Sequence, residues 1–254
     1  MKKENIHPVK SVSQSEAVSR KAGQFDRVKK IRHSLAHLLA SVVVEFWPKT
    51  KLAIGPTIES GFYYDMEILS DKKQATNDKK MLTTEDLQKI EARMKELIKE
   101  NQKFVGKKVS KITAKKLFKN SPYKLKIIKE LPGKTVGTYQ NGNFLDLCRG
   151  GHVTNTKEID PNSFKLVKIA GAYWRGDEKN KMLTRIYGVA FETEKELQEY
   201  LKMQEAAEKR DHKIIGPQLE IFMFHPTAPG MPYWLPKGVI VLNELISFWR
   251  EEHK

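Results

Sequence analysis

The chain contains a single cysteine, Cys148, among its 254 residues. One cysteine excludes a disulfide within the chain and is typical of a reducing compartment. The sequence also has no apolar run close to the roughly 20 residues that a membrane-spanning helix needs. Its polar start, Met1-Lys2-Lys3-Glu4-Asn5, lacks the apolar core of a secretion signal. Together these absences predict a soluble, cytoplasmic protein with no membrane partner.

Acidic residues are too few to balance the basic ones. Lys and Arg number 46 against 31 Asp and Glu, which gives a net charge of +15 at pH 7. Such an excess favours a polyanionic partner. A solvated, lysine-rich surface is the alternative that composition alone leaves open.

Two histidines four residues apart, His33 and His37, stand early in the first segment with helical apolar spacing. On a helix this spacing places both imidazoles on one face, about one turn apart. The apolar stripe of the same helix lies nearly opposite and consists of Ile31, Leu35, Leu38, Leu39, Val42 and Phe46. The face of the histidines carries small side chains, which would leave room for a ligand.

A second cluster, Cys148-Arg149-Gly150-Gly151-His152, supplies a thiol and a third imidazole. It follows a predicted hairpin that turns at Asn141-Gly142. The Gly-Gly pair would let the chain turn sharply between Cys148 and His152.

Three histidines and a cysteine are compatible with different chemistries. They are a ligand set for tetrahedral zinc. They could also form a metal-free hydrolytic site in which a neutral imidazole activates water. Coincidence is a third reading, and a nucleophilic Cys148 is disfavoured because no helix N-terminus lowers its pKa. The spacing does not decide among them.

The rest of the chain alternates helical and β-prone segments. A first helix is expected from near Asp26 to before Pro48, and a second from Thr83 or Thr84 to Lys99. Basic helical segments occupy 113–130. Strands or hairpins are expected over 52–65, 135–147, 164–172 and 182–191, and helices over 193–213 and from near Lys237. The segment 69–82 reads as a charged loop.

Longer strings in a fixed order over about residues 26–254 resemble the threonyl-tRNA synthetase family. The strings are His33–His37, Gly55–Asp65, Asp146–His152, Gly171–Leu183, Arg210–Lys213, Phe222–His225, Ala228–Pro232, Trp234–Gly238 and Arg250–Lys254. The resemblance implies an α+β chain: a two-layer editing domain with an antiparallel sheet and packed helices, then a linker helix and the truncated start of a class II synthetase domain. The expected divisions are a disordered polar tail over 1–24, the editing domain over 25–192, the linker helix over 193–216, and the class II segment over 217–254.

The resemblance also implies roles for individual residues. His33, His37, Cys148 and His152 match the editing quartet, which in this reading hydrolyses seryl-tRNA made in error. The pocket residues that match are Tyr64, Lys124, Asp146 and Arg149, with Lys124 placed among the catalytic residues and the other three on the substrate. One departure concerns Gly151, where the family usually has proline.

The partner implied is tRNA whose acceptor end carries serine. Editing would require no cofactor, although zinc at the quartet remains an alternative. ATP, magnesium and a further zinc would serve only a synthetic core that this sequence lacks, so the chain alone is not expected to charge tRNA. Full-length relatives would be homodimers, and the sequence leaves the oligomeric state of this chain open. The rival functions are a zinc-dependent deacylase of the alanyl type and a non-catalytic tRNA-binding fragment.

Overall fold

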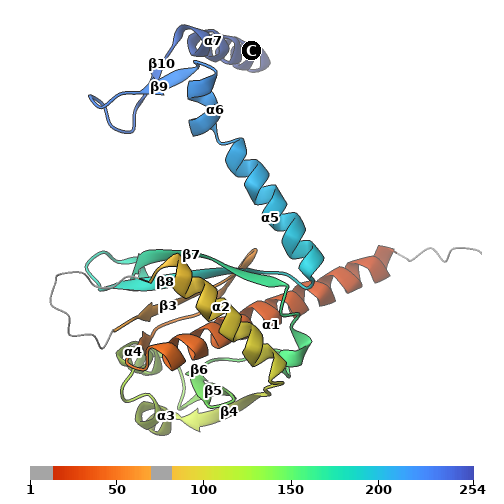
Figure 1. Cartoon of the computed structure of the whole chain (residues 1–254), viewed down its shortest axis with the longest axis vertical. Helices are drawn as coiled ribbons and strands as arrows, with labels where there is room; N and C mark the ends of the chain where they lie inside the picture. Colours follow the sequence, from red (N-terminus) through yellow and green to blue (C-terminus); the bar gives the residue numbers. More distant parts are fainter. Residues whose placement is uncertain (1–13, 70–81) are drawn as a thin grey trace, which may run out of the picture. The chain divides into compact units, whose positions relative to one another are not determined.

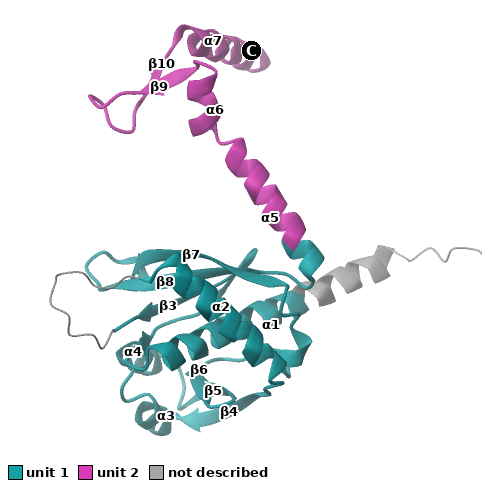
Figure 2. Cartoon of the chain, in the orientation of Figure 1, with its two compact units in different colours: residues 1–197 teal, residues 198–254 magenta. Residues whose placement is uncertain are grey.

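The computed structural model describes residues 14–69 and 82–254. The chain divides into two compact units, Met1–Leu197 and Gln198–Lys254 (Figure 2), which are treated separately below. The predicted loop at 69–82 falls almost entirely outside the described residues, as does the first half of the predicted tail. The divisions expected from the sequence remain predictions.

An antiparallel five-stranded sheet forms one side of unit 1 (Figure 1). Its strands run in the order β1-β3-β8-β7, and β2 pairs with β3. Phe62, Tyr64 and Met66 alternate along β3 and bury their side chains on the face that contacts the helices. The expected strand regions are confirmed, with the bounds β1 Lys51–Leu52, β2 Thr57–Ile58, β3 Gly61–Glu67, β7 Phe164–Tyr173 and β8 Met182–Ala190.

The helix α1, Gln14–Phe46, packs against this sheet. It begins at Gln14 rather than near Asp26, so the predicted start of this helix is wrong by 12 residues. The prediction relied on apolar periodicity, whereas residues 14–24 are mostly polar and include good helix formers, such as Ala17, Ala22 and two glutamines, without an apolar stripe. Phe46 was assigned to the apolar stripe but is 40% exposed, because it is the last residue of the helix.

The helix α2, Thr84–Lys99, packs on α1 and on β7. Thr83 caps it, and the side chain of Asp86 completes a capping box by accepting from the Thr83 N–H. The predicted start of this helix is therefore confirmed. Its predicted apolar positions are all buried, namely Leu87, Ile90, Met94, Leu97 and Ile98.

A second antiparallel sheet, in the order β4-β5-β6, lies on the other side of α1 (Figure 1). It adds a third layer to the two that the resemblance implies, and it explains why α1 is buried almost all round between Ile31 and Val43. The predicted hairpin is confirmed as β5, Thr135–Asn141, and β6, Phe144–Leu147. The elements that accompany it are β4 Phe104–Ser110, α3 Lys111–Leu117, α4 Pro122–Glu130, and the short 3-10 turns Thr156–Glu158 and Trp174–Gly176.

Unit 2 begins within α5, Glu194–Lys209. The single helix predicted over 193–213 is wrong at its end, because Asp211 caps a new helix and its side chain accepts from the Lys213 N–H. A two-stranded antiparallel ribbon and a last helix follow. Their bounds are α6 His212–Gln218, β9 Phe222–Phe224, β10 Pro232–Trp234 and α7 Pro236–Glu252. These elements do not amount to a class II catalytic domain within the described part of the chain.

Helices long and apolar enough to cross a membrane are absent from residues 14–69 and 82–254.

Candidate active site

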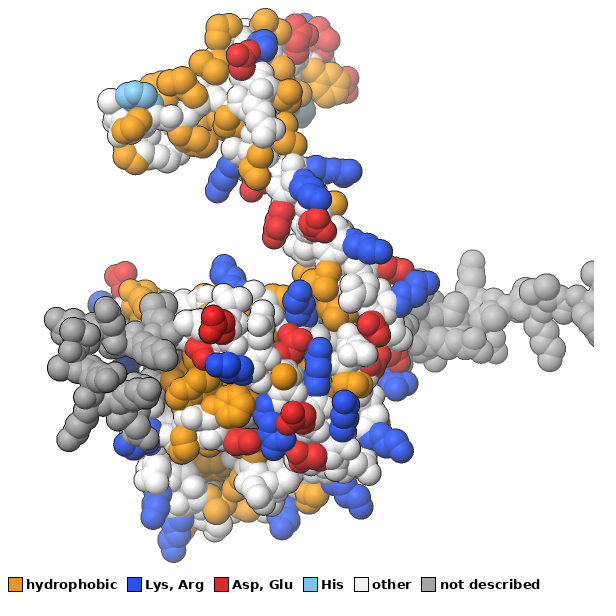
Figure 3. All heavy atoms as spheres, in the orientation of Figure 1, with side chains coloured by type: hydrophobic (Ala, Val, Ile, Leu, Met, Phe, Trp, Pro, Cys, Tyr) orange, Lys and Arg blue, Asp and Glu red, His pale blue; other side chains and the backbone are white. Residues whose placement is uncertain are grey.

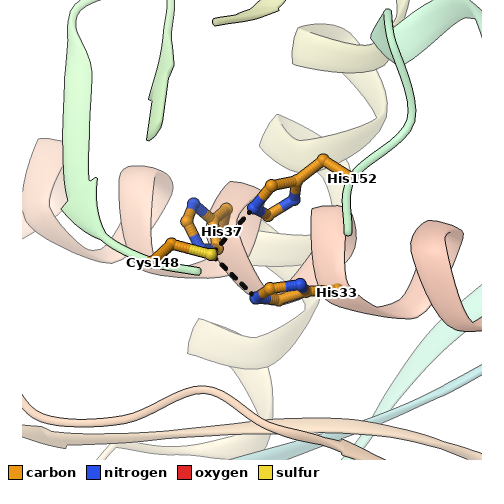
Figure 4. A group of neighbouring side chains, drawn as sticks. All are labelled: His33, His37, Cys148 and His152. Atoms are coloured by element: carbon orange, nitrogen blue, oxygen red, sulfur yellow. Dashed lines mark hydrogen bonds between the residues drawn. The ribbon is translucent and has the colours of Figure 1, made fainter. Parts of the chain in front are cut away.

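The three histidines and the cysteine that the sequence singled out lie together in unit 1 (Figure 4). One side-chain nitrogen or sulfur from each lies within 4.8 Å of the others. The Sγ of Cys148 is 3.4 Å from Nε2 of His33 and 3.2 Å from Nε2 of His152. The predicted convergence of these four side chains, the quartet below, is confirmed, and their roles remain predictions.

Local structure explains how the quartet assembles. His33 and His37 are one turn apart on α1, and their rings make an edge-to-face contact at 5.2 Å between centroids. Cys148 comes directly after β6. Gly150 and Gly151 then take φ values of +108° and +88°, which residues with a Cβ rarely adopt. This turn brings the ring of His152 over that of His33, with centroids 4.1 Å apart.

A second cluster lies beside the quartet and consists of Tyr64, Lys124 and Asp146. The Tyr64 hydroxyl donates to Oδ2 of Asp146 at 2.5 Å. The Nζ of Lys124 is 2.9 Å from that hydroxyl and 2.5 Å from Oδ1 of Asp146. All three side chains are buried. Since Oδ2 of Asp146 also lies 3.9 Å from Nε2 of His37, the two clusters are in contact.

Burial sets the protonation states of the quartet. Desolvation lowers the pKa of His33, and it lowers the pKa of His37 well below the usual value. The pKa of His152 falls to about 2 for the same reason. Burial raises the pKa of the Cys148 thiol to about 11. Without a metal, three neutral imidazoles and a protonated thiol therefore face one another at neutral pH.

A cavity of about 450 Å³ opens beside both clusters. His33, His37 and Cys148 line one part of it, together with Tyr64, Lys124 and Asp146. Arg149 also lines the cavity and is exposed to solvent. Its other walls are mainly apolar, from Ala53, Ile54, Pro56, Ile127, Leu131 and Leu147. Every residue predicted from the sequence except His152 lines this cavity, and His152 supports it from behind through His33.

The quartet also fits a metal ion. A thiolate and three imidazoles are a zinc donor set, and donors around tetrahedral zinc lie between about 3 and 4 Å apart, given bonds of about 2.0–2.3 Å. The separations from Cys148 fall in that range. The Nδ1 of His37 is buried and has no hydrogen-bond partner in the described part of the chain, so one polar atom of this imidazole is unsatisfied. The residues present are therefore compatible with zinc.

Three residues that support the quartet were missed from the sequence. Phe104 stacks on the ring of His152 at 4.9 Å with an interplanar angle of 6°, and Tyr139 contacts the same ring. Ser34 contacts Nδ1 of His152. Ser34 lies inside the His33–His37 string and could have been noted. No sequence pattern indicated that Phe104 would be buried, because most of the other residues of its strand, β4, are exposed.

Comparison with known proteins gives two kinds of match. Residues 136–187 match the family model of the second additional domain of threonyl and alanyl tRNA synthetases. This stretch contains Asp146, Cys148 and His152, whereas His33, His37, Tyr64 and Lys124 come from outside it.

Curated relatives match most of the chain. It is 52% identical over 226 residues to a threonine–tRNA ligase of Thermotoga neapolitana, which covers 88% of this chain and 34% of the relative. The corresponding protein of Dehalococcoides mccartyi is 46% identical over 239 residues, covering 91% of this chain and 39% of that protein. The threonine–tRNA ligase of Borrelia turicatae is 44% identical over 238 residues, which cover 93% of this chain and 39% of that protein. The chain thus spans between a third and two fifths of the length of these relatives. It is homologous to the N-terminal region of threonine–tRNA ligases and includes the second additional domain found in threonyl- and alanyl-tRNA synthetases.

Proposed function

We propose that unit 1 hydrolyses the ester bond of seryl-tRNA made in error, as the editing part of a threonine–tRNA ligase. The main observation behind this proposal is that the neutral imidazoles of His33 and His37 and the ammonium group of Lys124 line the same cavity. Hydrolysis of an activated ester needs a base to take a proton from water and a positive group near the oxyanion that develops.

The roles follow from position. His33 and His37 line the cavity, and their lowered pKa values leave each imidazole with a lone pair that can accept a proton from water at neutral pH. Lys124 is oriented by Tyr64 and Asp146, so its ammonium group would be placed near the ester without having to reorganise. Tyr64, Asp146 and Arg149 would contact the aminoacylated end of the tRNA.

Size would select the substrate. Serine lacks one methyl group of threonine, and a synthetic site can reject it by only about 1–3 kcal/mol, so a second pocket must sort the products. The thiol of Cys148 and the imidazole of His33 both line this cavity, and in this proposal they exclude the extra methyl group of threonine.

The tRNA would be held by lysines next to the cavity. Residues 107–134 contain a single acidic residue, Glu130. Figure 3 shows Lys and Arg side chains around the lower margin of unit 1, where Figure 1 places β4, α3 and α4. The exposed lysines of this basic segment are Lys107, Lys108, Lys115, Lys116, Lys119, Lys126, Lys129 and Lys134. Since α4 also supplies Lys124 and Ile127 to the cavity wall, phosphates bound here would lead toward it.

A second candidate is a zinc-dependent deacylase, which the mutual approach of the four donor atoms favours. His33, His37, Cys148 and His152 would hold the ion, which would supply a Lewis acid and a water of lowered pKa. Tyr64, Lys124 and Asp146 would keep their positions on the substrate side.

Deacylation assays distinguish the candidates. The chain is mixed with seryl-tRNA and, separately, with threonyl-tRNA, each with and without a zinc chelator. Faster hydrolysis of seryl-tRNA that survives chelation supports the metal-free site. If the chelator abolishes hydrolysis and added zinc restores it, the zinc-dependent deacylase is supported. Tight tRNA binding without turnover in either condition would reduce the chain to an RNA-binding fragment.

A further inference from the structure

Ser34 stands between the two histidines of α1 and is fully buried. Its hydroxyl oxygen has three close polar neighbours. The carbonyl oxygen of Lys30 is at 2.9 Å and the backbone nitrogen of Val153 at 3.1 Å. The Nδ1 atom of His152 is at 3.2 Å. Ser34 therefore joins the first helix to the loop that carries His152.

The donors and acceptors at this hydroxyl can be assigned one by one. A hydroxyl has one proton to donate and two lone pairs to accept with. The Lys30 carbonyl can only accept, and two oxygens 2.9 Å apart repel each other unless a proton lies between them. The hydroxyl proton is therefore directed to Lys30. The Val153 N–H can only donate, so it occupies one lone pair.

The remaining lone pair of Ser34 faces Nδ1 of His152, and this contact is a hydrogen bond only if Nδ1 carries the proton. We propose that Ser34 is a positioning residue that holds the neutral His152 ring in its Nδ1–H tautomer, so that the lone pair of Nε2 faces the Sγ of Cys148. A neutral imidazole has one protonated nitrogen, and the second is left as an acceptor.

Packing contacts fix the orientation of the His152 ring, and a hydrogen bond selects its tautomer. Phe104 stacks flat on the His152 ring, and Tyr139 packs against the same ring at a tilt of 50°. These ring contacts hold the plane of the imidazole but do not select a tautomer, because neither is a hydrogen bond to a ring nitrogen. Within the described part of the chain, Ser34 supplies the hydrogen bond to Nδ1 that makes this choice.

The tautomer has a consequence for the quartet. The Nε2 of His152 lies 3.2 Å from Sγ of Cys148, and the Gly150 N–H donates to the same sulfur. With Nε2 unprotonated, the thiol proton has an acceptor, and the imidazole is also in the form that a metal ion would require. His152 cannot then donate a proton toward the centre of the quartet. The catalytic part of this inference rests on the proposed function, whereas the tautomer itself does not.

The tautomer can be measured without turnover. The full chain is labelled with ¹⁵N-histidine and treated with a chelator, and long-range ¹H–¹⁵N correlation spectra near pH 7 show which ring nitrogen of each histidine is protonated. Comparison with His152→Gln identifies the signals of His152. We expect Nδ1 to be protonated and Nε2 not. A wild-type ring protonated at Nε2 would overturn the inference, whatever the behaviour of the variants.

Variants at Ser34 test the cause. Ser34→Ala removes the acceptor of Nδ1–H, so the population should shift toward the Nε2–H form, and kcat for seryl-tRNA should fall about 10–100-fold with KM nearly unchanged. Ser34→Thr keeps the hydroxyl and should restore both readouts. Ser41→Ala, about two turns further along α1, is the matched control and should leave both unchanged. An unaltered tautomer in a folded Ser34→Ala chain contradicts the proposal, as does a Ser34→Thr chain with the Nε2–H form. Absence of turnover in the wild type would count against the proposed function and leave the tautomer result standing.

Discussion

The Nζ of Lys124 lies 2.5 Å from Oδ1 of Asp146, and both side chains are almost completely buried. The two residues come from different elements, α4 and β6. Asp146 also accepts from the Tyr64 hydroxyl and from the Leu147 N–H. Because each charge has lost most of its water, each depends on the other, and the pair ties the basic helix to the wall of the cavity.

The first prediction concerns this pair. Lys124→Met leaves the Asp146 carboxylate buried and unpaired, so the free energy of unfolding should fall by about 3–5 kcal/mol. Adding Asp146→Asn should recover part of that loss, because the amide can still accept from Tyr64. Urea unfolding followed by fluorescence measures both variants. Lys30→Met, which breaks an exposed ion pair with Asp26, is the control and should cost at most about 1 kcal/mol. Equal losses for Lys124→Met and Lys30→Met would show that the buried pair is not coupled as described.

The second prediction concerns the base. His33→Ala should lower the rate of seryl-tRNA hydrolysis by about a hundredfold or more, the usual effect of a positioned general base. The affinity for tRNA should hardly change, because in the proposed binding mode the basic segment, rather than His33, contacts the phosphates. Single-turnover deacylation and filter binding measure the two quantities. His225→Ala, at an exposed position of unit 2, serves as the control. Wild-type rates in His33→Ala would remove this imidazole from the chemistry.

The third prediction concerns substrate size. Cys148→Ala removes the sulfur from the cavity wall and should allow threonyl-tRNA to be hydrolysed, narrowing the preference for serine. The ratio of the two deacylation rates is the measurement. If that ratio is unchanged while both rates persist, the thiol has no part in the size filter.

The fourth prediction concerns the basic segment. Replacing Lys115, Lys116 and Lys119 by glutamine should weaken tRNA binding and reduce the slope of log K against log salt by about 2–3, since each phosphate contact contributes about 0.7–0.9. A control triple, Lys157, Lys165 and Lys168 to glutamine, makes the same change of charge at exposed positions on other elements. Binding is measured between about 50 and 200 mM salt. If the two triple variants show the same slope of log K against log salt, tRNA binding depends on the net charge of the chain and not on the position of the basic segment.

The fifth prediction concerns pH. The pKa of His152 in the folded chain is about 2 because of burial, and an unfolded histidine titrates near 6.5. Between these values the unfolded chain binds a proton that the folded chain does not, so the free energy of unfolding must fall as the pH falls below about 6.5. Between pH 7 and 5 the loss from this one group is about 2 kcal/mol.

Urea midpoints at the two pH values, with chelator present, should show a smaller loss in His152→Gln than in the wild type. His225→Gln should behave as the wild type does. A wild-type chain whose stability stays constant or rises toward pH 5 would contradict the burial of these neutral rings.

The sequence predicted the parts of the site that depend on local spacing. The interval between His33 and His37 indicated a shared helical face, and Gly150-Gly151 indicated a sharp turn. Contacts between distant segments could not be obtained in this way. Only the resemblance to a family identified Tyr64, Lys124 and Asp146. The hydrogen bonds of Tyr64 to Asp146 and to Lys124 join residues that are 82 and 60 positions apart in the sequence, so no local pattern predicts them.

Periodicity also failed where an element has no buried stripe. The strand β4 buries little beyond Phe104, and its lysines give no alternation of apolar and polar residues. The first turns of α1 are polar, so only helix propensity could have indicated them. The break at Asp211 was missed because a capping residue within a charged stretch resembles any other solvated aspartate.

The burial of α1 on both sides has a consequence for how the site opens. Amide protons around Leu35 and Leu38, between and beside the paired histidines, are held in a helix that both sheets cover, so their exchange with solvent requires unfolding of the whole unit. The loop that carries His152 comes to the surface at Gly151, but beyond it the Val153 N–H bonds the Ser34 hydroxyl and Val153 is buried. The amide proton of Gly151 should therefore exchange quickly through local opening, whereas that of Val153 should exchange as slowly as those of the helix. Protection that resumes within two residues would show that the exposed turn is anchored to the core on the side that carries His152.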